Sequence, residues 1–400
     1  MKPLMFSEDP QFWFETLRAL GHTAYGGADI NEVIATAQRI TAGDYESWYR
    51  EWYALGERIE REGRTATGAV TQRDALLRAS NYFRSAEFFL HGATADPRAD
   101  GVYRRAVQCF RDAIAHLPHI TPVEIPYEGT ILRGYFYRAP GVGPHPTVLT
   151  HSGFDGSAEE MHFIGAAAAH ERGYNVLSFD GPGQPAARHS DGLVFRPDWE
   201  HVVGPVLDWL LRKPEVGPLA LIGVSMGGLL APRAAAFEPR LAACVAIDGV
   251  YDLGLVSTAR LPMPRAAAEA LLRAPSAPEL DAALEQSIGK DPTARWAMQH
   301  GMWVMGVKTP RAFLASYLDY TLAGGIAEKI RCPTLVCEAE EDIFFAGQPE
   351  LLFQHLTCEK AYMKFTHADY AGAHCHAGAQ RLAFGRVLDW LDTTLARGRT

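Results

Sequence analysis

A serine flanked by glycines, between an apolar run and a helix-forming run, constrains this chain more than any other feature. The segment reads Leu221-Ile222-Gly223-Val224-Ser225-Met226-Gly227-Gly228. Small residues two positions before and after Ser225 allow a tight strand-to-helix turn, which lifts the hydroxyl clear of a sheet. The following helix adds its N-terminal partial positive charge and free backbone N–H groups. The pattern predicts that Ser225 is a nucleophile.

A serine hydroxyl needs a base to accept its proton and an acid to orient that base, because it is a poor nucleophile near neutral pH. In the fold where this turn is best known, the chain order is serine, acid, histidine. Downstream of Ser225, the apolar run 334–337 leads to Asp342, and His374 follows later. We therefore expect Ser225, Asp342 and His374 to form a catalytic set.

The acid has competitors close by in the chain. The strand in this position is followed by a small residue, two variable residues and the acid, and Ala339 to Asp342 fits that spacing. We predict Asp342 and interpret the neighbouring glutamates as a solvated loop face. These glutamates are Glu338, Glu340 and Glu341.

Asp248 is a second location for a carboxylate, directly after the strand-like run 243–247. An ordinary turn residue before Gly249 is an equally good interpretation of it. Both interpretations stay open at this point.

The base has two competitors, His367 and His376, which spacing alone does not eliminate. A Gly-Ala pair precedes His374 and indicates a flexible loop, and a helix predicted over 377–395 follows it. We predict His374 as the general base.

The developing oxyanion needs preorganised donors, and we expect two backbone amides. The first is the N–H of Met226, the residue after the nucleophile. The second should come from the loop after the strand predicted over 147–150, where Phe154 is the first choice and Gly153 the alternative. A further loop, Asp180-Gly181-Pro182-Gly183-Gln184, lacks the lysine and the G-x-G-x-x-G spacing of a phosphate site, so we interpret it as a tight structural turn.

Apolar runs alternate with helical stretches from residue 118 onward, which predicts a mostly parallel sheet covered on both faces. Glu128-Gly129 indicates a hairpin between the first two strands. The predicted strands are 122–127, 130–137, 147–150, 175–179, 219–224, 243–247, 334–337 and 362–365.

The remainder of the chain predicts two helical additions. Residues 1–117 form a helical N-terminal domain, with Asp44 as a helix cap and an aromatic stripe that includes Trp48 and Trp52 as core. Residues 118–400 form the catalytic domain, and an insertion over about 253–330 predicts a cap. The chain of 400 residues is long enough for both.

The net charge of −9 and the lack of a basic run exclude a nucleic-acid or anionic-membrane footprint. The start of the chain, Met1 to Asp9, becomes acidic before an apolar signal-peptide core can form, so we expect a cytoplasmic protein. Six scattered cysteines indicate reduced thiols, and we assign no metal and no cofactor. The expected partner is a small molecule.

The chain combines the motifs Ser47-Trp48-Tyr49-Arg50-Glu51-Trp52, Ser80-Asn81-Tyr82-Phe83-Arg84, Gly153-Phe154-Asp155-Gly156 with Glu159-Glu160, Asp180-Gly181-Pro182-Gly183-Gln184, the serine turn, and Gly372-Ala373-His374-Cys375. With these motifs, the chain resembles the α/β-hydrolases typified by 2,6-dihydroxypseudooxynicotine hydrolase and its relatives in polyketide and pigment pathways. The resemblance spans nearly the whole length. It implies an α/β-hydrolase fold with the N-terminal helices as a lid, a homodimer, and activity on C–C bonds next to carbonyls in some members. It also implies that Asp248 assists the histidine. Ser152 departs from the glycine that relatives often carry.

We therefore predict a serine-dependent hydrolase acting on an apolar or aromatic carbonyl compound. The resemblance favours C–C bond hydrolysis of a β-diketone or aryl-ketone-like substrate. A carboxylesterase or thioesterase is the first alternative, because the same machinery serves those bonds. A non-hydrolytic lyase or cyclase in natural-product biosynthesis is the second.

Overall fold

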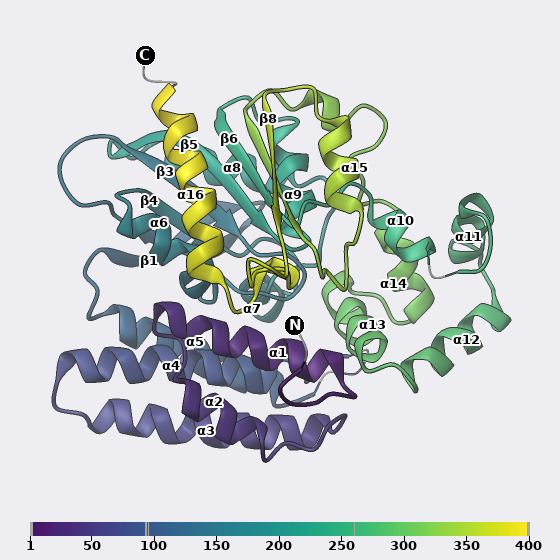
Figure 1. Cartoon of the computed structure of the whole chain (residues 1–400), viewed down its shortest axis with the longest axis horizontal. Helices are drawn as coiled ribbons and strands as arrows, with labels where there is room; N and C mark the ends of the chain where they lie inside the picture. Colours follow the sequence, from purple (N-terminus) through teal and green to yellow (C-terminus); the bar gives the residue numbers. More distant parts are fainter. Residues whose placement is uncertain (1–2, 93, 95, 260, 398–400) are drawn as a thin grey trace. The chain divides into compact units, whose positions relative to one another are not determined.

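The computed structural model describes residues 3–92, 94, 96–259 and 261–397, and the chain divides into two compact units (Figure 1). Unit 1 comprises Met1–Thr121 and Pro278–Pro310. Unit 2 comprises Pro122–Ala277 and Arg311–Thr400. The central part of the predicted insertion therefore groups with the N-terminal helices, and its two flanks group with the sheet.

Unit 1 is helical. Asp44 accepts hydrogen bonds from the backbone N–H groups of Glu46 and Ser47, and so begins the longest helix, α3. Helix α4 packs against both α3 and α5. The helices of unit 1 are α1 (Pro10–Gly21), η1 (His22–Tyr25), α2 (Ile30–Ala37), α3 (Tyr45–Thr65), α4 (Ala69–Glu87), α5 (Ala99–Ile114), α12 (Pro278–Ile288) and α13 (Pro292–Met305).

The aromatic stripe of α3 is core, as predicted. Trp48 and Trp52 are fully buried, and their ring centroids lie 5.7 Å apart. Trp48 donates its indole N–H to the carbonyl of Ser85 at 2.7 Å, which satisfies the one polar atom that this side chain buries.

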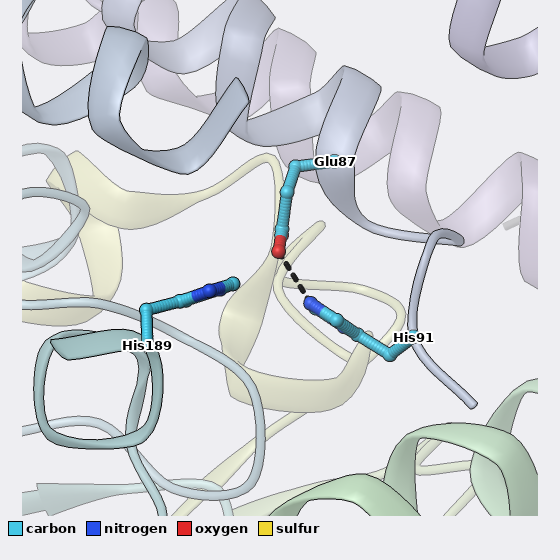
Figure 2. Close-up of side chains that lie close together, drawn as sticks. All are labelled: Glu87, His91 and His189. Carbon is cyan, nitrogen blue, oxygen red and sulfur yellow. Dashed lines mark hydrogen bonds and ion pairs between the residues drawn. The ribbon is translucent and has the colours of Figure 1, made fainter. Parts of the chain in front are cut away.

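A hydrogen-bonded cluster of Glu87, His91 and His300 joins the end of α4 to α13 inside unit 1. The Glu87 carboxylate accepts a hydrogen bond from Nε2 of His91 (Figure 2). Nδ1 of His91 lies 2.9 Å from Nδ1 of His300, and the His91 ring stacks on Trp303 with centroids 3.9 Å apart. These contacts satisfy polar atoms that would otherwise be costly to bury.

Unit 2 is built on an eight-stranded sheet with the order β1-β2-β4-β3-β5-β6-β7-β8. Strand β2 pairs antiparallel with β4, and the strands from β4 across to β8 pair in parallel. The predicted α/β-hydrolase fold with a mostly parallel sheet is confirmed. The strands are β1 (Ile120–Tyr127), β2 (Thr130–Tyr137), β3 (His145–His151), β4 (Asn175–Phe179), β5 (Val216–Val224), β6 (Leu241–Ile247), β7 (Thr334–Ala339) and β8 (Lys360–Phe365).

The chain order along the sheet reverses at β3, because β4 lies on one side of it and β5 on the other. Ligands of open α/β sheets bind outside the carboxyl ends of the strands at such a reversal. The interior strand β4 is buried at every position, including its polar residues Asn175 and Ser178, as expected for a strand covered on both faces.

Helices cover both faces of this sheet. Helix α16 packs with α6 and crosses the strands in Figure 1, whereas α8 packs with α9. The helices of unit 2 are η2 (His162–Ala166), α6 (Ala167–Glu171), α7 (Pro185–Asp191), α8 (Glu200–Leu210), α9 (Gly227–Ala235), α10 (Leu253–Thr258), α11 (Arg265–Leu272), α14 (Pro310–Tyr317), η3 (Ala327–Lys329), α15 (Gln348–His355), η4 (His374–His376) and α16 (Gln380–Arg397).

Within the described part of the chain, every helix is too short or too polar to cross a lipid bilayer.

Candidate active site

Ser225 occupies the sharp turn between β5 and α9. Its φ of 62° lies in the left-handed region that non-glycine residues rarely adopt. A Cβ on Gly223 would lie 2.0 Å from the carbonyl oxygen of Gly227, so only glycine fits there. The Ser225 N–H donates to the Ile247 carbonyl at 3.1 Å, which ties the strained turn to the end of β6.

His374 lies beside the serine. Its Nε2 is 2.9 Å from Ser225 Oγ, and its side chain is 5% exposed. The residue comes from the loop between β8 and α16, 149 positions after Ser225 in the chain. At this distance a neutral imidazole can accept the serine proton.

Two carboxylates share the other nitrogen of His374. Asp342 Oδ2 and Asp248 Oδ2 each lie 3.0 Å from His374 Nδ1. Asp342 also accepts backbone hydrogen bonds at Oδ1, from Phe344 at 2.7 Å and Phe345 at 3.1 Å. These bonds fix the carboxylate in a turn directly after β7. The structure thus brings together four residues that the sequence singled out.

Asp248 differs from Asp342 in its surroundings. It is fully buried, has a φ of 53° and follows β6. Its Oδ2 accepts a hydrogen bond from the Cys375 N–H, and its Oδ1 has no hydrogen-bond partner among the described residues. Burial acts to raise the pKa of Asp248, but the neighbouring His374 outweighs it and lowers that pKa.

The same charges act on the histidine in the opposite direction. Burial alone would lower the pKa of His374, whereas the negative charge of Asp342, with further contributions from Cys375 and Asp248, raises it well above its ordinary value. The carboxylates therefore stabilise the charged, imidazolium form of His374.

The competing residues lie elsewhere. His367 is exposed and pairs through Nδ1 with Glu341 at 3.1 Å. His376 is buried with Nδ1 3.0 Å from the Ala371 carbonyl, and burial lowers its pKa. Glu338 accepts hydrogen bonds from Tyr362 and Lys364. Glu340 accepts one from the backbone N–H of His367.

The loop after β3 passes directly against the serine turn. A Cβ on Gly153 would lie 2.5 Å from the Met226 nitrogen and 2.7 Å from the Val224 oxygen, so the close approach requires glycine. The side chain of Phe154 is buried and packs against Phe313, with centroids 5.9 Å apart. Gly153 and Phe154 are the two candidates for the second oxyanion donor. Their loop therefore borders Met226, the candidate for the first donor.

Residues 139–379 match a known protein family, the "Alpha/beta hydrolase family". This segment holds the serine, the histidine and both carboxylates. The chain is a member of the α/β-hydrolase family.

Similar sequences come from fungi. "Hydrolase LUC6" of a Fusarium species is 36% identical over 407 residues, covering 96% of this chain and 96% of that protein. "20-hydroxy-prefusarin hydrolase FUS2" of Gibberella moniliformis is 36% identical over 420 residues, again covering 96% of each chain. "Hydrolase acrC" of Aspergillus aculeatus is 35% identical over 419 residues, covering 95% and 96%.

Solved structures share the fold over nearly the whole chain. The structure of 2,6-dihydroxy-pseudo-oxynicotine hydrolase matches with a TM-score of 0.72 and 21% identity, covering 94% of this chain and 96% of that one. AbyA5 matches with a TM-score of 0.65 and 19% identity, covering 94% and 97%. The resemblance predicted from the sequence motifs is confirmed.

This α/β-hydrolase also holds residues at the site that the sequence did not reveal. Phe344 and Phe345 present their rings edge-on to His374, with centroids 4.8 and 5.5 Å away. Gln184 binds the loop after β3. Phe344 and Phe345 follow Asp342 within three positions, but the sequence does not indicate toward which residue their rings point. Gln184 belongs to the motif that the sequence indicates to be a tight structural turn.

Three side chains at the site present potential metal ligands. Atoms of Asp248, His374 and Cys375 lie within 4.8 Å of one another. However, burial raises the pKa of the Cys375 thiol to about 12, which disfavours the thiolate that a metal prefers. The His374 Nδ1 already has two carboxylate partners. These residues fit a proton-transfer network better than a metal centre.

Proposed function

We propose that this protein is a serine hydrolase with Ser225 as nucleophile, His374 as general base and acid, and Asp342 as the carboxylate that orients the histidine. Asp248 is an auxiliary carboxylate on the same imidazole nitrogen. One observation carries the proposal: His374 Nε2 lies 2.9 Å from Ser225 Oγ while its Nδ1 lies 3.0 Å from two carboxylates. An imidazole held in this way has its proton on Nδ1 and a free electron pair facing the serine.

The first half-reaction follows from these positions. Ser225 Oγ attacks the carbonyl carbon of the substrate as its proton passes to His374 Nε2. The tetrahedral oxyanion is held by the N–H of Met226 and by the N–H of Phe154, with Gly153 as the alternative donor. Collapse breaks the bond to the leaving group, which takes its electron pair and the proton from His374.

The second half-reaction restores the enzyme. Water attacks the acyl group on Ser225 while His374 takes a proton from it, and the protonated histidine returns that proton to the departing serine. For a β-diketone, the leaving group of the first half-reaction is an enolate that is protonated on carbon. Bonds made and broken balance without a cofactor.

Aromatic side chains support an apolar or aromatic substrate. Phe154, Phe313 and Tyr317 pack together beside the oxyanion loop, with centroid separations of 5.9, 6.1 and 4.7 Å. Phe344 and Phe345 flank His374. Such walls favour flat, weakly polar ligands. The named activity of the Gibberella relative, on 20-hydroxy-prefusarin, supports a natural product as substrate.

We propose a C–C bond next to a carbonyl as the bond that is broken, as the resemblance to the 2,6-dihydroxypseudooxynicotine hydrolase group implies. Ester or thioester hydrolysis and a non-hydrolytic lyase or cyclase reaction are the outcomes that the tests below distinguish. We also propose that the protein is a cytoplasmic homodimer. Light scattering of the purified protein tests the dimer through the mass of the particle.

A fluorophosphonate probe tests the nucleophile. Wild-type protein should be labelled at Ser225, and Ser225→Ala should not be labelled. His374→Ala should react far more slowly, while the exposed control His367→Ala should react like wild type. Equal labelling of wild type and Ser225→Ala would refute the assignment.

Parallel assays test the bond. Aryl β-diketones should be cleaved to a carboxylic acid and a methyl ketone, with ¹⁸O from labelled water in the acid. Turnover of p-nitrophenyl esters with no cleavage of any diketone would replace the C–C assignment with an esterase. Product that forms without incorporation of ¹⁸O would indicate a lyase or cyclase.

A further inference from the structure

We propose that Gln184 is a positioning residue of the oxyanion hole: its side-chain amide holds the carbonyls of the loop after β3 so that the following N–H groups face the oxyanion. The inference rests on the proposed function and adds a residue to it. Gln184 lies in the turn after β4, 41 positions before the nucleophile, in a motif that the sequence alone indicated to be structural.

The contacts of Gln184 are specific and fully buried. Its Nε2 donates to the Ser152 carbonyl at 2.7 Å and to the Gly153 carbonyl at 3.3 Å. Its Oε1 accepts from the Gly181 N–H at 2.7 Å. The side chain has no exposed surface. One amide therefore links the turn after β4 to the loop that borders Met226.

Peptide geometry gives these bonds a consequence for catalysis. In a trans peptide the C=O of one residue and the N–H of the next point in opposite directions. The described chain has no cis peptide bond. When Gln184 draws the carbonyls of Ser152 and Gly153 to its side, the N–H groups of Gly153 and Phe154 are directed to the opposite side. These are the two candidates for the second oxyanion donor, beside the N–H of Met226.

A second donor on the same carbonyl strengthens the arrangement. His151 Nδ1 lies 2.8 Å from the Ser152 oxygen, and Trp199 donates its indole N–H to His151 Nε2 at 3.2 Å. Trp199 thereby places the His151 proton on Nδ1, which makes Nδ1 the donor. Burial lowers the pKa of His151 to about 4, which keeps the ring neutral. The loop is thus preorganised before substrate arrives.

The turn that carries Gln184 is itself fixed. A Cβ on Gly181 would lie 2.5 Å from the Trp199 ring, so glycine is required where the turn meets that side chain. The Ala186 N–H donates to Asp180 Oδ2 at 2.9 Å. A rigid base is what a positioning residue needs, because an amide on a mobile loop could not fix the carbonyls.

Gln184→Met tests the proposal, because it keeps the length and bulk of the side chain and removes both polar atoms. We expect kcat to fall about 10- to 100-fold, less than complete loss of a donor, while KM changes less than about threefold. An aryl trifluoromethyl ketone, which mimics the tetrahedral state, should lose affinity in proportion to the fall in kcat/KM.

Gln348→Met is the matched control for a merely structural role. Gln348 is also a buried glutamine that caps backbone, since its Oε1 accepts from Tyr251 at 3.2 Å and Asp252 at 2.9 Å. Both variants should lose thermal stability. Only Gln184→Met should weaken the trifluoromethyl ketone more than a ground-state product analogue.

Gln184→Glu is the second variant, in case Gln184→Met does not fold. The carboxylate cannot donate to the two carbonyls, but its protonated form can donate one hydrogen bond. The ratio of variant to wild-type kcat should therefore rise as the pH falls. A ratio independent of pH, or a kcat for Gln184→Met within threefold of wild type, would overturn the role of Gln184. Absence of fluorophosphonate labelling in wild type would overturn the proposed function together with it, which distinguishes the two failures.

Discussion

The two sides of Ser225 present different kinds of polar group: side chains on one side and backbone N–H groups on the other. On the side of proton transfer, one hydroxyl and two carboxylates from the ends of β5, β6 and β7 meet at His374, each within 3.0 Å of one of its nitrogens. On the oxyanion side, the candidate donors are backbone N–H groups, and the polar side chains there, Gln184 and His151, bind carbonyls.

The two sides of Ser225 should therefore respond differently to substitution. A side-chain charge is removed by one substitution, so the proton-transfer side should show large single effects. A backbone donor remains under every substitution except proline, so the oxyanion side is altered only through the groups that aim it.

Loss of the imidazole should be the most damaging change. We expect His374→Gln to lower kcat by about 10⁴-fold or more, because among the described residues His374 is the base that lies within hydrogen-bond distance of Ser225 Oγ. Steady-state kinetics measure this effect. His367→Gln, at an exposed histidine of the same loop, should keep wild-type kcat. Residual activity within 100-fold of wild type would contradict the role of His374.

The two carboxylates should substitute for one another in part. Asp342→Asn should lower kcat by about 10²- to 10³-fold, and Asp248→Asn by about tenfold, since either variant leaves one carboxylate on Nδ1. The double variant should lose about 10⁴-fold, the cost of an imidazole held in the wrong tautomer. Steady-state kinetics of all four proteins give this cycle. A double variant no worse than Asp342→Asn would remove Asp248 from the mechanism.

The pH profile should report the charge on this side. The carboxylates raise the pKa of His374, and the base works only when neutral, so wild-type kcat/KM should fall as pH drops through that pKa. Asp248→Asn removes a negative neighbour and lowers the pKa, which should move the acidic limb to lower pH by about one unit or more. An acidic limb that stays in place would show that Asp248 does not act on His374 electrostatically.

The smallest effect should come from the aromatic wall beside the oxyanion loop. The Tyr317 ring packs against Phe154 with centroids 6.1 Å apart, and burial raises the pKa of Tyr317, so its hydroxyl stays protonated and can donate a hydrogen bond. We expect Tyr317→Phe to raise KM about fivefold for a substrate with a second oxygen, with little change in kcat. A monocarbonyl ester of similar size is the control substrate. Equal changes for both would limit Tyr317 to packing.

The proton-transfer side was largely predictable from the sequence. The Gly-flanked serine, the acid after β7 and a histidine before the last helix follow one another in a fixed order, and each has a local signal in its own neighbours. Asp248 had only an ambiguous signal, because a residue before a glycine is equally typical of a turn. Its distance to His374 depends on how β6 and β7 align in the sheet.

The oxyanion side was predictable only in outline. The sequence indicated which loop follows β3, but the carbonyl directions within that loop depend on Gln184 from another strand end and on His151 with Trp199. No periodicity or spacing relates these residues. The grouping of 278–310 with the N-terminal helices likewise depends on packing between distant segments.

The fold class and the chain order of the proposed catalytic groups could be predicted from the sequence, because hydrophobic alternation and a strained glycine turn are encoded by neighbouring residues. The tertiary structure was needed to show that two carboxylates share one imidazole nitrogen and that a glutamine binds the loop after β3. Such contacts join residues more than 30 positions apart, and their distances are set by strand register and side-chain packing rather than by any local pattern.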